Sequence, residues 1–477
     1  MRKLPLFVAL ITCSEVMYAD QFHYQNIIIG DRALGMGGAY SAVADDSSGV
    51  YYNPAGLGFA LSNDVSGSAN AFYAKKVTYK NILPGLSYQE NSNGSVPSFF
   101  GGLQKLDKVA KGLVFAFGVY STDSDLVDQD DKIADASKGL RFHRTAQVRG
   151  GDFNVAGGLG YRLSNSVAIG LSLTYGTFNS LTQDYQFSGQ FTSTVTKDSA
   201  ADSPCKKILT QVQINTPATA SMKCYQVLTQ NVRTSLEGKA IRPSIGVQVA
   251  LLSKLSIGLS LSANKWITQG LEQNIDSRKD TTAALIDGVQ DPNNSIPSDV
   301  VSETRSGSTT SSTYPVNITS KIDRSETAKP FGKDIQYSGR AGVAYFASPR
   351  LLITADTIYY GAVNDADVLD HNFKSVLNYA MGAEWYATPS FPVRLGLFTN
   401  NDNRDKPSLA QKKYNDHIDY IGGSAFLAWV QPNSQIGVGA VYQSGTGTAA
   451  KTGASAVALN DVSASSRTYA ISASHSF

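Results

Sequence analysis

Val167-Ala-Ile-Gly-Leu-Ser-Leu-Thr-Tyr175 alternates strictly between large apolar residues and small or polar ones. Successive side chains of a β-strand point to opposite faces, so this stretch predicts a strand with one apolar and one small face. A soluble sheet would carry water-exposed Lys, Glu and Thr on its second face. Here that face carries Ala, Gly, Ser and Thr. The alternation therefore favours a membrane barrel, with an apolar band against lipid and a lumen behind it.

The same alternation recurs along most of the chain, for example at 113–119, 245–251, 255–261 and 436–442. Most segments are close to the length of about ten residues that a tilted strand needs to cross a bilayer. The pattern predicts an all-β protein, a 14-stranded antiparallel transmembrane barrel. Its strands are expected near 64–76, 95–106, 112–121, 145–162, 167–178, 230–252, 254–268, 333–348, 350–360, 371–387, 391–400, 415–430, 433–444 and 467–477.

Short and long connections alternate between these segments. Turns such as 164–166, 253–254 and 432–434 are short, whereas joins such as 122–144, 179–229 and 269–332 are long and polar. Outer-membrane barrels have short periplasmic turns and long extracellular loops. We therefore expect a monomer in the outer membrane of a Gram-negative bacterium, surrounded by outer-membrane lipid and lipopolysaccharide. The alternating C-terminal strand ending at Phe477 resembles the signal that the barrel-assembly machinery reads.

Composition agrees with this interpretation. Charged residues make up 17% of the 477 residues, below the roughly 25% of soluble proteins. The net charge of +2 gives no electrostatic reason to expect a nucleic-acid partner. Residues 1–19 read as a signal peptide, with Arg2 and Lys3 before an apolar stretch. In the exported chain we expect Cys205 and Cys224 to form a disulfide, and no metal or cofactor, since no His lies near them.

About forty residues, 20–60, separate the expected signal peptide from the barrel at 61–477. They contain a glycine-rich stretch, an Ala44-Asp-Asp46 element and an Asn-Pro-Ala motif. A phosphate-binding loop is excluded, because no strand precedes the glycines and no Gly-Lys-Ser/Thr follows. Glycines permit tight turns and proline fixes local geometry, as a plug packed in a lumen requires. The residues concerned are Gly35, Gly37, Gly38, Asn53, Pro54 and Ala55.

These three elements, in this order, resemble the N-terminal hatch of the FadL-type family of outer-membrane transporters. The resemblance implies passive uptake of hydrophobic small molecules, such as long-chain fatty acids or aromatic hydrocarbons, through a hatch-closed barrel. It further implies lateral exit through a gap at a kinked third strand. We expect Gly118 to accommodate that kink, and Asn53 to contact the third strand between Gly112 and Tyr120.

Two groups of residues are candidates for contacting the ligand. The long loops 179–229 and 269–332 contain Ile208 and Leu209, and Leu285 and Ile286, the second pair in an expected short amphipathic helix. These apolar residues mark a binding site or simply pack the two loops together. The alternation of inward and outward positions also places two acidic residues, Asp356 and Glu384, and four cations in the lumen. The cations either bind the carboxylate headgroup of a ligand or pair with the two acidic residues. They are Arg242, Arg340, Lys374 and Arg394.

The alternatives are a secretion-associated or structural outer-membrane barrel, or a general porin. A porin needs no forty-residue hatch. An enzyme is not expected, because the five His residues form no Ser-His-Asp grouping and no His-Glu-x-x-His motif.

Overall fold

The computed structural model describes residues 22–83, 86–135, 140–191, 195–196, 221–285, 302–306, 309–316, 324–328, 334–363, 373–411, 416–452 and 457–477. The strands form one antiparallel sheet that closes on itself where the first strand pairs with the last, from Asp64↔Ser476 to Tyr79↔Val462. The prediction of a closed all-β barrel with fourteen strand positions is confirmed. Within the described ranges, no helix is long and apolar enough to span a membrane.

The barrel strands are β1(Asp64–Leu83), β2(Leu86–Lys105), β3(Leu113–Tyr120), β4(Ser124–Asp135), β5(Leu140–Arg162), β6(Val167–Phe191), β8(Ser221–Leu252), β9(Leu255–Leu285), β13(Gln336–Ser348), β14(Leu351–Tyr360), β15(Val376–Thr388), β16(Phe391–Asn400), β17(Asp416–Gln431), β18(Ser434–Thr452) and β19(Val457–Ser476). The third position is shared by β3 and β4, which both pair with β5. Smaller strands add to one end of the sheet: β7(Val195–Thr196) pairs with β8, β11(Thr309–Val316) and β12(Arg324–Ala328) pair with β9, and β10(Ser302–Ser306) pairs with β11.

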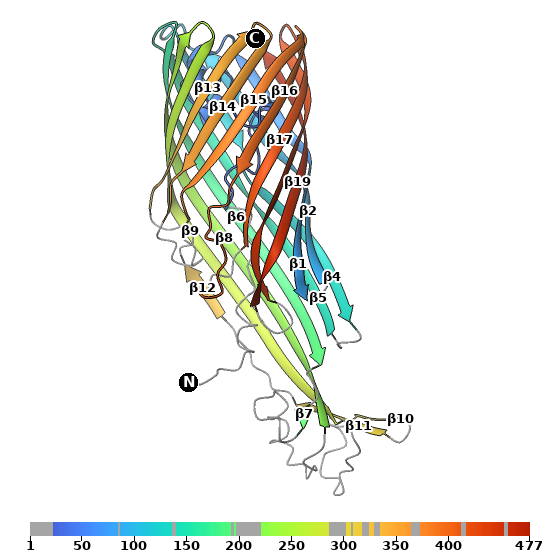
Figure 1. Cartoon of the computed structure of the whole chain (residues 1–477). Coiled ribbons are helices and arrows are strands. Elements are labelled where there is room, and N and C mark those ends of the chain that lie inside the picture. Colours follow the sequence, from blue (N-terminus) through green and yellow to red (C-terminus); the bar gives the residue numbers. More distant parts are fainter. Residues whose placement is uncertain are drawn as a thin grey trace.

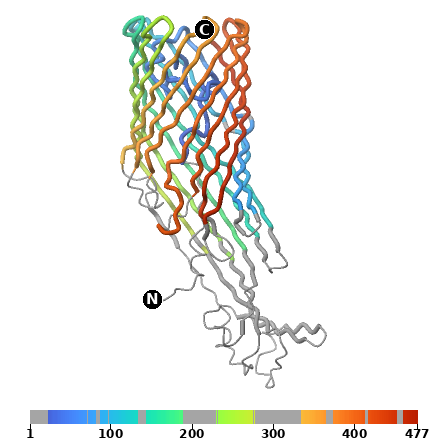
Figure 2. Tube along the Cα trace, viewed as in Figure 1, coloured from blue at the N-terminus to red at the C-terminus, as the bar shows by residue number. Residues whose placement is uncertain are grey.

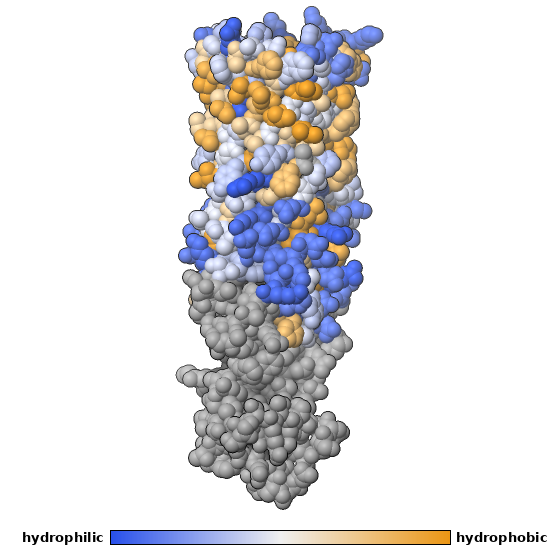
Figure 3. Space-filling view, turned by 90° about the vertical axis from the view of Figure 1, so that its right-hand side faces the viewer, coloured by the Kyte–Doolittle hydropathy of each residue, from blue (hydrophilic) through white to orange (hydrophobic). Residues whose placement is uncertain are grey.

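The alternation along each strand separates outside from inside as expected. Leu171 and Leu173 on β6 are more than half exposed, whereas Ser172 between them is 3% exposed. Apolar residues gather on the outer wall toward the end that carries the short turns, and hydrophilic residues cover the wall beyond them (Figure 3). We call these two ends of the barrel the short-turn end and the long-loop end.

The strands continue far beyond the apolar band at the long-loop end, where β8 and β9 reach furthest (Figure 1). Much of the sequence expected to be long loops is therefore strand: β6 ends at Phe191, and β9 ends at Leu285. The expected short helix around Leu285 is wrong, since Ala283 pairs with Cys224 in the β8–β9 ladder. The expected loop 122–144 is likewise largely β4 and the start of β5.

Residues 22–63 enter the barrel and fold inside it near the short-turn end (Figure 2). They contain the short helices α1(Asp31–Gly35) and α2(Gly49–Tyr52) and the 3-10 helix η1(Gly56–Phe59). We call residues 22–63 the N-terminal segment. Its apolar side chains, including Ile29, Leu34, Met36 and Leu57, form one buried cluster with inward residues of the wall.

Buried charged side chains tie the N-terminal segment to β14, β15 and β16. Arg32 donates to both carboxylate oxygens of Glu384 on β15, each at 3.0 Å, and Arg394 on β16 donates to the same carboxylate at 2.7 Å. Asp356 on β14 accepts hydrogen bonds from the backbone amides of Tyr40 (3.1 Å) and Ser41 (2.9 Å). Removing one member of such a buried ion pair typically costs about 3–5 kcal/mol, so this network holds the segment firmly in place.

Candidate functional site

The wall of the barrel is interrupted in its third strand. β3 pairs with β2 from Lys105↔Val114 to Phe99↔Tyr120, but β4 shares with β2 the single register pair Ser92↔Val127. Residues 121–123 separate β3 from β4. The Ser121 amide still donates to the Ser98 carbonyl at 3.2 Å, but between this bond and the Ser92↔Val127 pair the ladder with β2 is lost, so residues 93–97 face 122–126 without register pairs, although β5 continues past both strands.

Side chains and the N-terminal segment satisfy the backbone groups at this break. The Asp152 carboxylate on β5 accepts hydrogen bonds from the amides of Thr122 (2.7 Å) and Asp123 (2.9 Å). The amide of Ile27 donates to the Thr122 carbonyl at 3.1 Å. The Asn26 side chain donates to the Asp123 carboxylate at 3.0 Å. Buried backbone groups without partners are costly, so these contacts allow a break in the wall.

A cavity of about 180 Å³, which we call the lumenal pocket, lies directly against the break. Thr122, Asp123 and Asp152 line it on the side of the break. Its other walls come from the N-terminal segment, from β6, β8, β9, β13 and β14, and from residues beyond β14. The lining is rich in aromatic rings: Tyr24, Tyr51, Phe178, Trp266, Tyr360 and Phe373. Tyr24 stacks on Tyr360 with ring centroids 4.1 Å apart, which fixes the segment against this wall.

Arg242 on β8 is the cation that lines the lumenal pocket. It donates to the Tyr120 hydroxyl at 2.7 Å. Arg340 on β13 lies over the Tyr51 ring at 4.9 Å and donates to its hydroxyl at 3.1 Å. Within the described part of the chain, neither guanidinium has a carboxylate within ion-pair distance. Both guanidinium groups therefore hydrogen-bond to phenol groups rather than to carboxylates.

The other two expected lumenal cations lie elsewhere. Arg394 faces inward but is paired with Glu384 and lies 3.7 Å from Asp31, so it anchors the N-terminal segment. The expectation that Lys374 faces the lumen from a strand is wrong. β15 begins only at Val376, and Lys374 pairs with Asp405 in the neighbouring loop. Arg394 and Glu384 therefore pair with each other, as the second of the two sequence-based alternatives expects.

Two predictions about the third strand need correction. Gly118 lies within the continuous strand β3, paired with Gly101 and Ala156, so the break lies at 121–123 instead. The lack of a side chain at Gly118 serves close packing, because an added Cβ would lie 3.1 Å from the Val50 side chain. The Asn53 side chain does not hydrogen-bond to the described third strand: its amide donates to the carbonyls of Ser41 (2.8 Å) and of Val247 on β8 (3.3 Å).

The other motif residues pack the N-terminal segment against the wall. Gly37 and Gly38 have φ of 64° and 85°, a left-handed conformation that glycine adopts without strain, and they turn the chain after α1. An added Cβ on Gly35 would lie 2.6 Å from Arg394 Cβ. Pro54 and Ala55 cover Gly170 of β6, where any side chain would overlap them.

Several sequence predictions lie outside the described residues. They are the signal peptide 1–19, Ile208, Leu209, Ile286 and the partner Cys205 of the expected disulfide. Leu285 and Cys224 are described as strand residues, without their side chains. In the ranges that the structure covers, no group of three or more His, Cys, Asp or Glu residues is placed to hold a metal ion.

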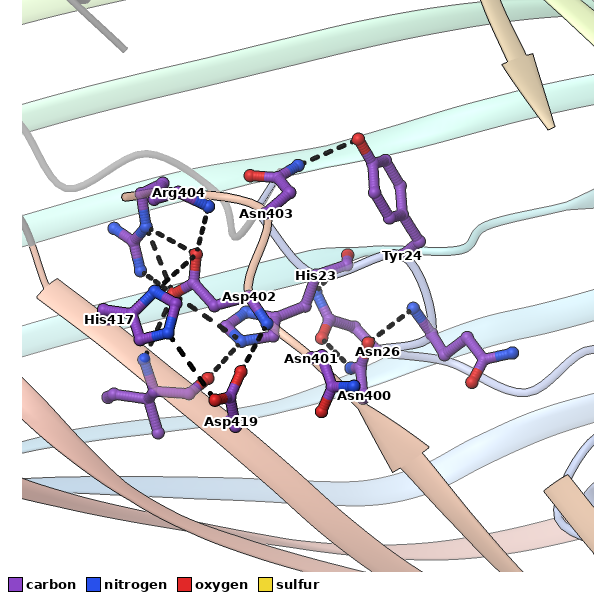
Figure 4. Close-up of polar contacts among 12 residues, drawn as sticks. His23, Tyr24, Asn26, Asn400, Asn401, Asp402, Asn403, Arg404, His417 and Asp419 are labelled. Carbon is purple, nitrogen blue, oxygen red and sulfur yellow. Dashed lines mark hydrogen bonds and ion pairs between the residues drawn. The ribbon is translucent and has the colours of Figure 1, made fainter. Parts of the chain in front are cut away.

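A polar cluster joins the start of the N-terminal segment to the loop after β16 (Figure 4). Asp402 lies at its centre and accepts hydrogen bonds from Arg404, at 3.0 Å from Nε and 2.6 Å from Nη2. His23 Nε2 donates to the Ile418 carbonyl at 2.7 Å and lies 3.9 Å from the Asp402 carboxylate. Although burial alone raises the pKa of Asp402, Arg404 and His23 outweigh it and hold this pKa below its usual range.

Replacing Asp402 with Asn is expected to loosen the start of the N-terminal segment. Hydrogen bonds to a charged group contribute about 1.5–3 kcal/mol, so local opening becomes easier by about that amount. The measurement is hydrogen exchange at the Asn403 amide, which donates to the Phe22 carbonyl. Lys374→Gln is the control, because the Lys374 side chain is exposed and ion pairs of exposed side chains contribute little.

Lowering the pH is expected to loosen the start of the N-terminal segment, as Asp402→Asn does, because it protonates Asp402. A carboxyl with a lowered folded-state pKa stabilises the fold above its unfolded pKa of about 3.9. That stabilisation is lost as the pH falls through the folded value. Unchanged protection of Asn403 in the variant would show that the Asp402 cluster does not hold the segment.

Solved structures with the same architecture are known, although no protein-family model and no curated protein matches the chain. A Pseudomonas aeruginosa FadL homologue aligns with a TM-score of 0.56 at 11% identity, over 95% of this chain and 100% of the other. The Ralstonia pickettii toluene transporter TbuX aligns with a TM-score of 0.51 at 12% identity, over 95% and 100%. The P. putida toluene transporter TodX gives 0.50 at 13%, over 94% and 99%. The chain therefore has the fold of FadL-type channels, and two of these three structures, TbuX and TodX, are described as toluene transporters.

Proposed function

We propose that this chain, which has the fold of FadL-type channels, is an outer-membrane transporter that takes up hydrophobic small molecules passively. One observation carries the proposal: an aromatic pocket lies beside a break in the barrel wall, and the N-terminal segment lies between this pocket and the short-turn end. Short turns face the periplasm in outer-membrane barrels. The ligand then arrives from the long-loop end, outside the cell, and meets the N-terminal segment as a hatch.

The break offers an exit into the membrane. A hydrophobic ligand that left through a wet channel would meet the aqueous periplasm. Leaving through the wall keeps its apolar surface out of water, at roughly 25 cal/mol per Å². Open backbone groups facing lipid are costly. Asp152 and Ile27 supply partners for these groups when the break is closed, so we infer that movement of Asn26 and Ile27 opens the route.

Arg242 favours an amphipathic anion, such as a long-chain fatty acid, as the ligand. Its guanidinium faces the pocket without a carboxylate partner in the described chain, and arginine binds carboxylates strongly. The aromatic lining suits an aromatic hydrocarbon equally well. At about 180 Å³, the pocket is below the roughly 300–1,000 Å³ of sites for drug-sized ligands, so a long chain also needs the segment to move.

The alternatives fit the arrangement less well. A general porin needs an open lumen, whereas residues 22–63 occupy the lumen of this barrel near its short-turn end. A secretion-associated or structural barrel gives no role to an aromatic pocket that borders a break. We further propose that the barrel is a monomer that the barrel-assembly machinery inserts through its C-terminal strand.

Uptake by deletion and complemented strains tests the function, with a labelled long-chain fatty acid and labelled toluene as probes. Arg242→Gln is expected to lower the affinity for the fatty acid about tenfold to a hundredfold, because a hydrogen bond to a charged group contributes about 1.5–3 kcal/mol. Toluene uptake should be unchanged, because toluene carries no charge. Lys374→Gln is the matched control, since it removes a cation outside the pocket. Equal uptake by the deletion and complemented strains would refute the transport function.

A further inference from the structure

A groove of about 910 Å³ crosses the outer wall of the barrel over β14 to β19. Small residues make its floor, namely Ala383, Gly423, Ala425 and Ala440. Larger apolar and aromatic side chains border it, including Met381, Leu397, Tyr442 and Tyr469. Because these small residues lie among the larger ones that border them, they leave a depression in the surface that contacts lipid.

The groove is inclined along the barrel. One row of its lining residues consists of register partners on successive strands, namely Ile353, Ala383, Leu395, Ala425, Ala440 and Tyr469. Ile353 lies two residues after the start of β14 at the short-turn end, whereas Tyr469 lies seven residues before the end of β19 at that same end. The groove therefore rises from the short turns toward the long-loop end.

Two cations lie at the raised end of the groove. Arg467 lines it and lies opposite Ala74 of β1, and Lys76, two residues further along β1, is on the same face. Both side chains are exposed, and neither is paired with a carboxylate in the described part of the chain. Arg467 lies nine residues before Ser476. At about 3.3 Å per residue and a tilt of about 40°, nine residues rise about 23 Å, close to the about 25 Å height of the apolar band of such barrels.

We propose that this groove binds an acyl chain of lipid A, with a lipid A phosphate held between Arg467 and Lys76. The short turns face the periplasm in the proposed outer-membrane orientation, on which this inference rests, so Arg467 lies at the boundary of the outer leaflet. A lipid of that leaflet has its headgroup at this boundary and its chains pointing inward, as the inclination of the groove requires. Two cations without a carboxylate partner among the described residues match the anionic phosphate of lipid A better than the zwitterionic headgroup of phosphatidylethanolamine.

The test measures lipid A and phospholipid retained per barrel, by mass spectrometry after extraction in a mild detergent and extensive washing. Ala425→Phe and Ala440→Phe each fill the groove, and Arg467→Gln combined with Lys76→Gln removes the positive charge. Each is expected to lose most of the retained lipid A. Ala341→Phe on β13 and Arg149→Gln on β5 are matched controls on exposed positions away from the groove, and they should retain it.

Heat-modifiable gel mobility establishes that each variant is folded before its lipid content is compared. Lipid A retention equal to wild type in the groove and charge variants would overturn the proposal, as would preferential retention of phospholipid by the wild type. Ligand uptake should be normal in all these variants, because the groove lies on β14–β19 and the break lies between β2 and β4. Failure of the lipid site is thus distinguishable from failure of the transport function.

Discussion

Oxidation of an Ile27→Cys/Thr122→Cys variant is expected to abolish uptake of hydrophobic ligand, and a reductant is expected to restore it. The Ile27 amide donates to the Thr122 carbonyl at 3.1 Å, so the two backbones are close enough for a disulfide. The bond would hold the N-terminal segment on the break in the third strand. If the ligand leaves through the wall there, the locked segment blocks its only exit into the membrane.

The control locks the same segment at another place. Ser47 and Ser66 of β1 have their hydroxyl oxygens 2.8 Å apart, so Ser47→Cys/Ser66→Cys forms a bond away from Thr122. Cys205 and Cys224 are replaced by Ser in both variants to prevent exchange. Uptake should persist in the control. Complete cross-linking of Ile27→Cys/Thr122→Cys with unchanged uptake would exclude exit at the break.

Deletion of residues 30–56 is expected to leave a folded barrel with a large leak. These residues include α1 and α2 and most of the side chains that the N-terminal segment contributes to the buried cluster. The wall closes by its own backbone ladder from β1 to β19, so it does not need the segment to hold together. Once the lumen is empty, water and ions pass. The measurements are single-channel conductance in planar bilayers and heat-modifiable gel mobility.

Glu384→Gln provides a milder version of the deletion at full chain length. It leaves Arg32 and Arg394 buried around a neutral side chain, and loss of one partner of a buried ion pair costs about 3–5 kcal/mol. We expect transient opening events in place of a permanent leak. Unaltered conductance in the deletion would show that the N-terminal segment does not close the barrel.

The candidate site could be predicted only in part from the sequence. The alternation of inward and outward positions placed Arg242 and Arg340 in the lumen, and both lie beside Tyr51 of the N-terminal segment. The residues at the break, Asp152 and Ile27, carried no sequence signal. Asp152 acts there because β5 continues past the gap between β3 and β4, and Ile27 acts because the segment passes beneath it. Such contacts join residues that are far apart in the chain, so no local pattern predicts them.

The sequence by itself determined the barrel and the facing of its strands, as Val167–Tyr175 illustrates. Side-chain alternation is a property of each strand alone, and the apolar face must meet lipid wherever the strand lies. Only the tertiary structure decided what the small inward face meets. Gly170 touches Pro54, and Ser172 donates to the Val50 carbonyl at 2.9 Å. A small residue suits a watery lumen and a tightly packed segment equally well, so its identity alone does not distinguish them; the path of residues 22–63 through the barrel does.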